Sequence, residues 1–552
     1  MECRPFFLYL AVALLGVLLA IPGLEDIPFT QQDEITYSST ALSNQVVVYW
    51  ILNNSLEIIG DSVNTETLLS LFTEKNLQLS FPYYSKPIYD TILLLSISIW
   101  DESIGSVLYV NLISFACGIF LIGKVGEQLF GRTVGLLAAL FFSTSGSVLV
   151  YARSGMAHMP SISFCLAGIY LFLHFLQKKE CPSTFWKVGF LWGVGFAIHP
   201  NLTPYIGLIG MGGLVYHYKF NTGKDALGYA LSLTGGVFGL LLFIEVGYQL
   251  FGWALRDVLI DVQSWQSVPF RTYFEQLSMH ASAVTNADVP LSIKLYTYLL
   301  LYWAHEGIFV TLLVIWGTGK FLVKAKSDVI SFVVLIFWIP ILYFTLSQNQ
   351  AVYRYAAGLV IPSAIIAAVC MEQILQRLAV VLNIQRKWVT LIACMGIIAV
   401  NFSHFKPIYQ VGSAWKESAH WLKSQGESRV VSHGGATLWE LYGIEEVTPS
   451  AEVGIVKYTA IFKRYQSETE RKFVFQNGEE IHAISSFPHK RADILLEVDF
   501  LKNDPVLNGI ENAPFIGDTI TELKNRALFY KNMHRLDIYK RPDKKINHAT
   551  SG

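Results

Sequence analysis

The residues best suited to chemistry in this sequence are two adjacent carboxylates, Asp33 and Glu34. They lie about ten residues beyond a first apolar stretch, and the nearest cation downstream is Lys75, so no neighbour in the sequence neutralises them. A carboxylate in such a place could act as a general base. We predict Asp33 as that base, with Glu34 in a secondary role. The alternative is an ordinary solvated helix start, because acidic side chains favour the first turn of a helix.

Three basic residues beside apolar stretches could bind an anion. Arg354 lies eight residues before Pro362 in an apolar helix, Arg153 lies in the short polar segment 151–158, and Lys86 directly precedes Pro87 in the long segment 24–103. A charged side chain at the end of a membrane span is costly unless it is paired or reaches the lipid headgroups. A planar guanidinium is also suited to two parallel hydrogen bonds with a phosphate. We predict all three as phosphate ligands, with headgroup contacts as the alternative.

Two histidines lie in connections of the same kind. His158 ends the polar segment 151–158, and His199 precedes Pro200 between two apolar stretches. Each could ligate a metal ion or hold a substrate hydroxyl, and each could equally be a structural hydrogen-bonding group. We keep both as candidates for a metal or acceptor contact. A divalent cation, Mg²⁺ or Mn²⁺, stays open as a cofactor.

The composition of the chain is that of a membrane protein with many spans. Of its 552 residues, 53% are hydrophobic and only 15% are charged, and aromatic residues make up 14%. Such a profile is atypical of a soluble multidomain enzyme. The net charge is −1, so no global basic field points to nucleic acid. The six cysteines lie in or beside apolar stretches without CxxC spacing, which gives no sign of a metal site.

Eleven apolar stretches are assigned as membrane spans. The segment 87–100 is not counted, because its 14 residues fall short of the about 20 that a span needs and because Asp90 lies inside it. With this choice, Lys and Arg gather in the connections on one side, which is the positive-inside pattern. The spans are expected at about 5–23, 104–123, 133–150, 159–176, 185–199, 200–217, 226–251, 291–317, 329–347, 356–376 and 388–403.

Successive spans cross the membrane in opposite directions. The same assignment of spans therefore places the polar segments of interest together on the outer face. These segments are 24–103, 151–158, 199–201, 252–290, 348–358 and the tail from 404. All the candidate residues named above lie in them or at their edges. We therefore predict an integral, multi-pass membrane protein, in the plasma membrane, with its active site at the extracytoplasmic interface.

The tail differs in character from the rest of the chain. Residues 404–552 are charged and mixed, with an amphipathic helix expected at 414–423. Short strands are expected at 428–432, 472–475, 494–498 and 536–540. The predicted fold is an all-α membrane domain, 1–403, with about eleven transmembrane helices plus interfacial helices. A small extracytoplasmic α/β domain, 404–552, follows it.

The chain contains several short motifs. Their order along the sequence is more specific for a protein family than any single motif is. The acidic pair Asp33-Glu34 is followed by Lys86-Pro87-Ile88-Tyr89, by Leu129-Phe130-Gly131-Arg132, by Tyr151-Ala152-Arg153, and by Arg354-Tyr355 with Pro362. In this order, residues 1–400 resemble the GT-C glycosyltransferases. Within that superfamily they resemble the dolichyl-phosphate-mannose–protein mannosyltransferases and the bacterial lipid A aminoarabinose transferases. Two positions depart from the pattern: His158 stands where relatives usually have an aspartate, and Ile88 replaces a second proline.

The resemblance implies inverting transfer of a monosaccharide from a polyprenyl-phosphate donor to a hydroxyl acceptor on the extracytoplasmic face. The expected partners are that donor and membrane lipid, with no nucleic acid and an acceptor still to be identified. Such a transfer needs one base and cations near the leaving phosphate. Two alternatives stay open: a transporter or flippase for a lipid-linked saccharide, and a non-catalytic relative with a binding role.

Overall fold

The computed structural model describes most of the helical part and several segments of the tail. The described residues are 3–24, 86–100, 104–254, 272–275, 290–323, 328–347, 353–410, 414–432, 443–447, 458–462, 483–488, 490–510, 516–533 and 535–540. The predicted base Asp33 and its neighbour Glu34 lie outside these residues. The prediction that they carry the chemistry therefore stays a prediction.

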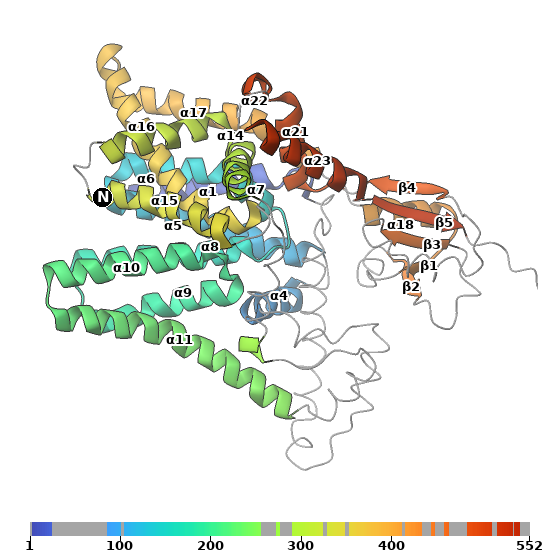
Figure 1. Cartoon of the computed structure of the whole chain (residues 1–552), viewed down its shortest axis with the longest axis horizontal. Helices are drawn as coiled ribbons and strands as arrows, with labels where there is room; N and C mark the ends of the chain where they lie inside the picture. Colours follow the sequence, from blue (N-terminus) through green and yellow to red (C-terminus); the bar gives the residue numbers. More distant parts are fainter. Residues whose placement is uncertain are drawn as a thin grey trace, which may run out of the picture.

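The apolar stretches form helices that lie side by side across the left and centre of Figure 1. They are α1 (Cys3–Ala20), α4 (Pro87–Trp100), α5 (Ile104–Phe130), α6 (Arg132–Ser143), α7 (Gly146–Ala152), α8 (His158–Lys178), α9 (Trp186–Ile198), α10 (Thr203–Phe220), α11 (Gly223–Ala254), α14 (Leu291–Val323), α15 (Asp328–Ser347), α16 (Val360–Val381) and α17 (Arg386–Phe405). Short 3₁₀ helices connect them: η2 (Pro182–Phe185), η3 (Pro200–Leu202), η4 (Tyr353–Leu359) and η5 (Lys406–Gln410).

The number of spans differs from the eleven expected. Among the described residues, seven helices are long and apolar enough to cross a membrane, or eight if one bent pair is a single span. The segment expected to span at 185–199 is the 13-residue helix α9, which at 1.5 Å per residue reaches only about 20 Å of the about 30 Å needed. The segment 87–100 is a helix of 14 residues, α4, as short as expected. The count of eleven is therefore not confirmed.

Two helices of the membrane part are broken. The stretch expected as one span at 133–150 is the pair α6 and α7, bent by 60°. The Ser145 hydroxyl accepts from the Val148 N–H at 3.3 Å and caps α7, which stabilises the new helix start. In α14 the break falls at Gly307, whose φ of 77° is left-handed and suits only glycine well. Both breaks lie at the level of the site described below.

Close packing holds the helices together. α5 packs against α1, α6 and α8, while α9 packs against α8 and α11. A Cβ atom at Gly189 of α9 would lie 2.0 Å from the Leu233 carbonyl oxygen of α11, so only glycine permits this approach. The same holds for Gly236, where a Cβ atom would lie 2.2 Å from the Trp186 carbonyl oxygen. Small residues at such crossings are typical of helices packed within membranes.

The described residues of the tail form a mixed sheet and four α-helices. The strand order is β2-β1-β3-β5-β4, with β1 parallel to β2 and β3 and with β5 antiparallel to β3 and β4. The strands are β1 (Arg429–Ser432), β2 (Glu445–Val447), β3 (Tyr458–Phe462), β4 (Ser485–Pro488) and β5 (Arg535–Lys540). The helices are α18 (Ala414–Ser424), α21 (Ala492–Asn503), α22 (Pro505–Ile510) and α23 (Gly517–Met533).

One strand of the tail was predicted wrongly. Residues 494–498, expected as a strand, lie inside helix α21. Leu496 and Phe500, one helical turn apart, are both buried, so the apolar residues follow the helical period. α21 and α23 pack against α14, and Figure 1 shows α21, α22 and α23 between the membrane helices and the sheet. The division of the chain into domains 1–403 and 404–552 stays a prediction.

Candidate functional site

Three aromatic rings form a stack where the ends of α7, α8 and α9 meet. Tyr151 is the last residue but one of α7, His158 begins α8, and His199 follows α9. The ring centroids of Tyr151 and His158 are 4.4 Å apart at 11°, and those of His158 and His199 are 4.2 Å apart at 38°. The His199 Nδ1 accepts from the Asn201 N–H at 3.3 Å, which places the proton of a neutral ring on Nε2. Two predicted site residues thus lie in direct contact.

The segment between Tyr151 and His158 is held by side chains from other helices. The Tyr89 hydroxyl of α4 donates to the Gly155 carbonyl at 2.5 Å. The Asn111 amide of α5 donates to the Met156 carbonyl at 3.0 Å and also to the Ser154 carbonyl. Buried backbone carbonyls need such partners. The position of His158 is therefore fixed from two sides by the fold.

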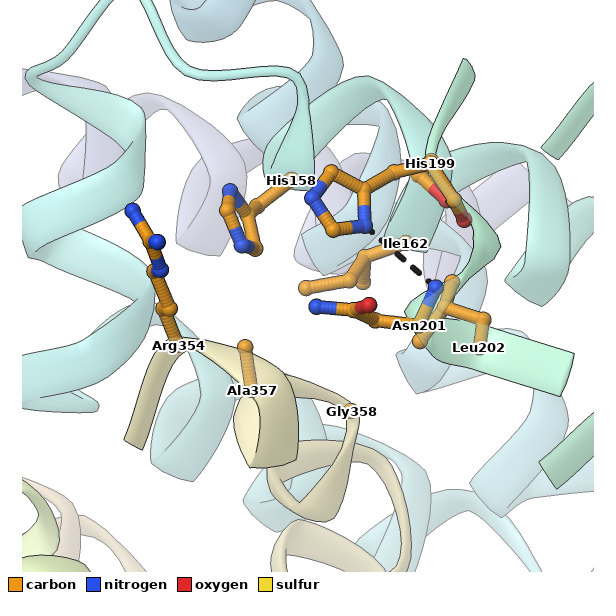
Figure 2. Close-up of a pocket in the computed structure, with 9 residues that line it drawn as sticks. His158, Ile162, His199, Asn201, Leu202, Arg354, Ala357 and Gly358 are labelled. Carbon is orange, nitrogen blue, oxygen red and sulfur yellow. Dashed lines mark hydrogen bonds between the residues drawn. The ribbon is translucent and has the colours of Figure 1, made fainter. Parts of the chain in front are cut away.

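Arg354 completes a small pocket with the two histidines. The pocket is lined by α8, the turn after α9 and η4, and Figure 2 shows His158 between Arg354 and His199. About 10 Å³ is accessible to the centre of a water-sized sphere, room for about one water molecule. The lining residues are His158, Ser161, Ile162, His199, Asn201, Leu202, Arg354, Ala357 and Gly358.

Two of the predicted phosphate ligands lie near the same histidine. The charges of Lys86, at the start of α4, and of Arg354 both act on the His158 ring. The structure therefore brings His158, His199 and Arg354 into one pocket, although they are up to 196 residues apart in the chain, and the charge of Lys86 acts on the His158 ring. Two cations beside polar rings can bind an anion such as a phosphate.

Arg153, the third predicted phosphate ligand, has a different set of partners. Its side chain is 2% exposed, and its Nη1 donates to the carbonyls of Ala20 at 2.8 Å and Pro22 at 2.6 Å. The guanidinium carbon lies 4.8 Å from the centre of the Tyr409 ring. Burial lowers the pKa of Arg153 to about 10, which leaves it charged at neutral pH. These contacts cap the end of α1, so the structure gives Arg153 a structural role that does not require a phosphate.

Sequence reasoning missed the charged residues that α21 brings to this region. Arg491 and Asp493 form an ion pair, with 2.6 Å between Nη2 and Oδ2 and 3.1 Å between Nε and Oδ1. The charges of Asp493, Glu497 and Arg491, like that of Arg354, act on the Tyr151 hydroxyl. Burial alone would raise the pKa of Asp493, but Arg491 outweighs it and lowers the value to about 2. Acidic residues are common in the first turn of a helix. The sequence around Asp493 therefore gives no indication that this residue lies near Tyr151.

The described residues include no group of three or more His, Cys, Asp or Glu side chains that could hold a metal ion. His158 and His199 alone would supply two ligands. A divalent cation in this part of the protein would need further ligands from segments outside the described ranges, such as Asp33 and Glu34. The expectation of a Mg²⁺ or Mn²⁺ site therefore stays a prediction.

Comparisons with known proteins agree with this architecture. Residues 85–248 match the family described as dolichyl-phosphate-mannose-protein mannosyltransferase. The apo structure of ArnT from Cupriavidus metallidurans is similar at 11% identity and a TM-score of 0.51, over 87% of this chain and 96% of that one. Its structure bound to undecaprenyl phosphate is similar at 12% identity and a TM-score of 0.50, over 88% and 97% of the two chains. The chain has the GT-C glycosyltransferase fold.

Two further comparisons concern a second solved structure and curated protein sequences. The archaeal oligosaccharyltransferase AglB from Archaeoglobus fulgidus, in complex with an inhibitory peptide and a dolichol-phosphate, matches at 12% identity with a TM-score of 0.47, over 86% of this chain and 71% of that one. A comparison with curated protein sequences gives no match. With its long apolar helices and this fold, the chain is an integral, multi-pass membrane protein. The family match covers Lys86, Arg153, His158 and His199, whereas Arg354 lies beyond it.

Proposed function

We propose that this GT-C chain is a glycosyltransferase that moves a monosaccharide from a polyprenyl-phosphate donor to a hydroxyl acceptor, with inversion, on the extracytoplasmic face of the membrane. The observation that carries the proposal is the pocket that Arg354 forms with His158 and His199. The charge of Lys86 acts on the same His158 ring, and the sequence predicts both cations as phosphate ligands. The donor's phosphate would lie at these cations, with its sugar directed toward the histidine pair.

An apolar groove supports a donor with a long hydrocarbon chain. It measures about 640 Å³ and is lined by α5, α8, α10, α15 and α16. Ile361 and Pro362, on its wall, follow Arg354 within the continuous segment formed by η4 and α16. Apolar walls beside a cationic site fit an isoprenoid chain attached to a phosphate. ArnT, which has the same fold, has been solved bound to undecaprenyl phosphate.

The proposed chemistry needs few groups. The acceptor hydroxyl attacks the anomeric carbon, its proton passes to a base, and the bond from that carbon to the phosphate oxygen breaks. Asp33 is proposed as the base, with Glu34 orienting it. The leaving polyprenyl phosphate takes the bonding electrons, so Lys86 and Arg354 would stabilise the charge that develops on it. No separate general acid is required, because a phosphate is already a good leaving group.

His158 and His199 are proposed to line the acceptor side of the site. His158 occupies the position at which the resembled family usually has an aspartate, so a neutral or hydrogen-bonding group replaces a carboxylate. The hexose or pentose that is moved and the protein, lipid or glycan that receives it are determined by contacts beyond those described here. A divalent cation remains an optional part of the proposal.

The experiment that tests the proposal uses the purified full chain in lipid nanodiscs. Polyprenyl-phosphate-linked hexoses and pentoses, each with an undecaprenyl or a dolichyl chain, are supplied with candidate hydroxyl acceptors. Release of polyprenyl phosphate together with a glycosylated acceptor is the expected result. In vesicles, movement of an intact labelled donor across the bilayer without release of phosphate would instead support the transporter alternative. Donor binding without either reaction would support a non-catalytic relative.

A further inference from the structure

A polar contact joins helix α21 of the tail to the broken helix α14. His305 lies next to the break at Gly307, and its side chain is only 1% exposed. Its Nε2 lies 3.6 Å from Oε1 of Glu497, a residue of α21 whose side chain is 15% exposed. The rings of Trp303 of α14 and Phe500 of α21 lie 5.5 Å apart. A polar contact through Glu497 and an aromatic contact through Phe500, three residues apart on α21, therefore dock this helix on α14.

The broken part of α14 also contacts the start of α7. A Cβ atom at Gly146 would lie 2.1 Å from the His305 carbonyl oxygen, so the two backbones touch there. Glu306, which is 2% exposed, accepts a hydrogen bond from the Ser145 hydroxyl at 3.0 Å and another from the Ser147 hydroxyl. A carboxylate buried in this way is costly unless it is hydrogen-bonded. The pairing of Glu306 with both serines thus fixes α7 to the residues around the break.

Helix α7 leads directly to the aromatic stack of the site. It has seven residues, and Tyr151 lies five residues after Gly146. The Tyr151 ring stacks on His158, so a displacement of α7 would move the surface against which His158 rests. Closely packed elements transmit such displacements because few voids are available to absorb them.

We propose that α21 is a positioning element of the site: Glu497 holds His305 at the break in α14, and through Glu306 and Gly146 that break sets the position of α7 and of the Tyr151 ring beneath His158. Glu497 and His305 are positioning residues in this scheme, because they act through other residues. The tail of the chain would thereby determine how well the site is formed. The inference rests on the proposed function only for its prediction on turnover. The coupling between α21 and residues 146–152 can be measured without any activity.

A second observation agrees with this role of α21. Asp493 and Glu497 lie one helical turn apart, and the charges of both act on the Tyr151 hydroxyl, as does that of Arg354. Asp493, whose side chain is 21% exposed, is paired with Arg491, and the charge of that arginine also acts on the Tyr151 hydroxyl. α21 therefore reaches the stack by electrostatics as well as by packing.

The test compares the full chain with the Glu497→Gln variant, which preserves size and removes the charge. Hydrogen–deuterium exchange is measured on peptides from α21 and from residues 146–152. We expect exchange in 146–152 to be about three- to tenfold faster in the variant, because a weaker docking raises the frequency of local opening. The matched control is Glu522→Gln on α23, an exposed acidic residue of the same tail, which should leave 146–152 unchanged.

A second variant tests whether the effect of Glu497→Gln comes from weaker docking of α21 and not from the loss of the Glu497 charge alone. Phe500→Leu weakens the contact with Trp303 and alters no charged group, and it should also speed exchange in 146–152. Faster exchange in α21 alone, with 146–152 unchanged in both variants, would show that the tail detaches without affecting the site and would overturn the proposal. Unchanged exchange in both segments would overturn it as well.

Activity supplies the second readout. Glu497→Gln should lower turnover by about tenfold, because small displacements of aligned groups are costly, while donor affinity stays within about twofold. A loss of donor affinity with unchanged turnover would contradict a positioning role. If the wild type transfers no sugar yet exchange in 146–152 responds to Glu497→Gln, the coupling stands and the proposed function fails.

Discussion

Replacing Arg354 by alanine should weaken donor binding more than any other single change among the described cations. Arg354 lines the pocket with His158 and His199, and its charge and that of Lys86 act on the same ring. A pair of unit charges about 4 Å apart near a protein surface is worth about 4 kcal/mol. Lys86 would retain part of this attraction after the change. We therefore expect a loss of about 2–4 kcal/mol, or a factor of about 30 to 1000 in Kd.

The assay is equilibrium binding of a polyprenyl-phosphate sugar to the purified protein in nanodiscs. Arg354→Lys should restore less than half of the lost free energy, because an ammonium keeps the charge but lacks the two-pronged guanidinium. Arg132→Ala is the matched control. That arginine begins α6, just beyond the C-terminal end of α5, and its side chain is 75% exposed. If Arg354→Ala binds the donor within about twofold of the wild type, the phosphate lies elsewhere and the headgroup interpretation of Arg354 is correct.

Substitutions at five further positions test other parts of the proposed site. Asp33→Asn should lower sugar transfer by about 100-fold or more with donor binding nearly intact, as loss of a general base does, whereas Glu34→Gln should have a smaller effect; equal transfer by Asp33→Asn and wild type would refute the base assignment. Arg153→Ala should lower thermal stability strongly and Arg153→Lys should recover little, because about 1.5–3 kcal/mol rests on each hydrogen bond of the charged group; a thermal unfolding curve checks this. Leu208→Trp, which fills the apolar groove, should weaken binding of long-chain donors about tenfold and leave a two-isoprene analogue unchanged, since only the long chain would reach the filled volume. His158→Asn should alter the preference among acceptors and leave any activation by Mg²⁺ or Mn²⁺ unchanged; loss of that activation would make His158 a metal ligand.

Much of the site could be predicted because membrane topology restricts where polar segments lie. Assigning 87–100 as a segment that does not cross placed 151–158, 199–201 and 348–358 on one face, and the structure brings His158, His199 and Arg354 from these segments into one pocket. The residue types then indicated an anion site, because cations and histidines at the end of a span are costly without a function. Arg153 shows the limit of this reasoning. Its sequence context resembles that of Arg354, and only the tertiary structure reveals that its hydrogen bonds go to the end of α1.

What could not be predicted depends on contacts between elements far apart in the chain. A stretch such as 133–150 is apolar throughout, so its composition does not disclose the 60° bend that separates α6 from α7. That bend exists together with the break at Gly307, since Glu306 bonds the serines of α7 and Gly146 touches His305. The Glu306 side chain, beside the break in α14, accepts from both serine hydroxyls at the start of α7, and buried polar groups need such partners. The two breaks therefore form one structural unit, and the aromatic stack lies where that unit meets the tail. Helix α21 packs against both α14 and α7, and these are the contacts through which we propose that the tail positions the site.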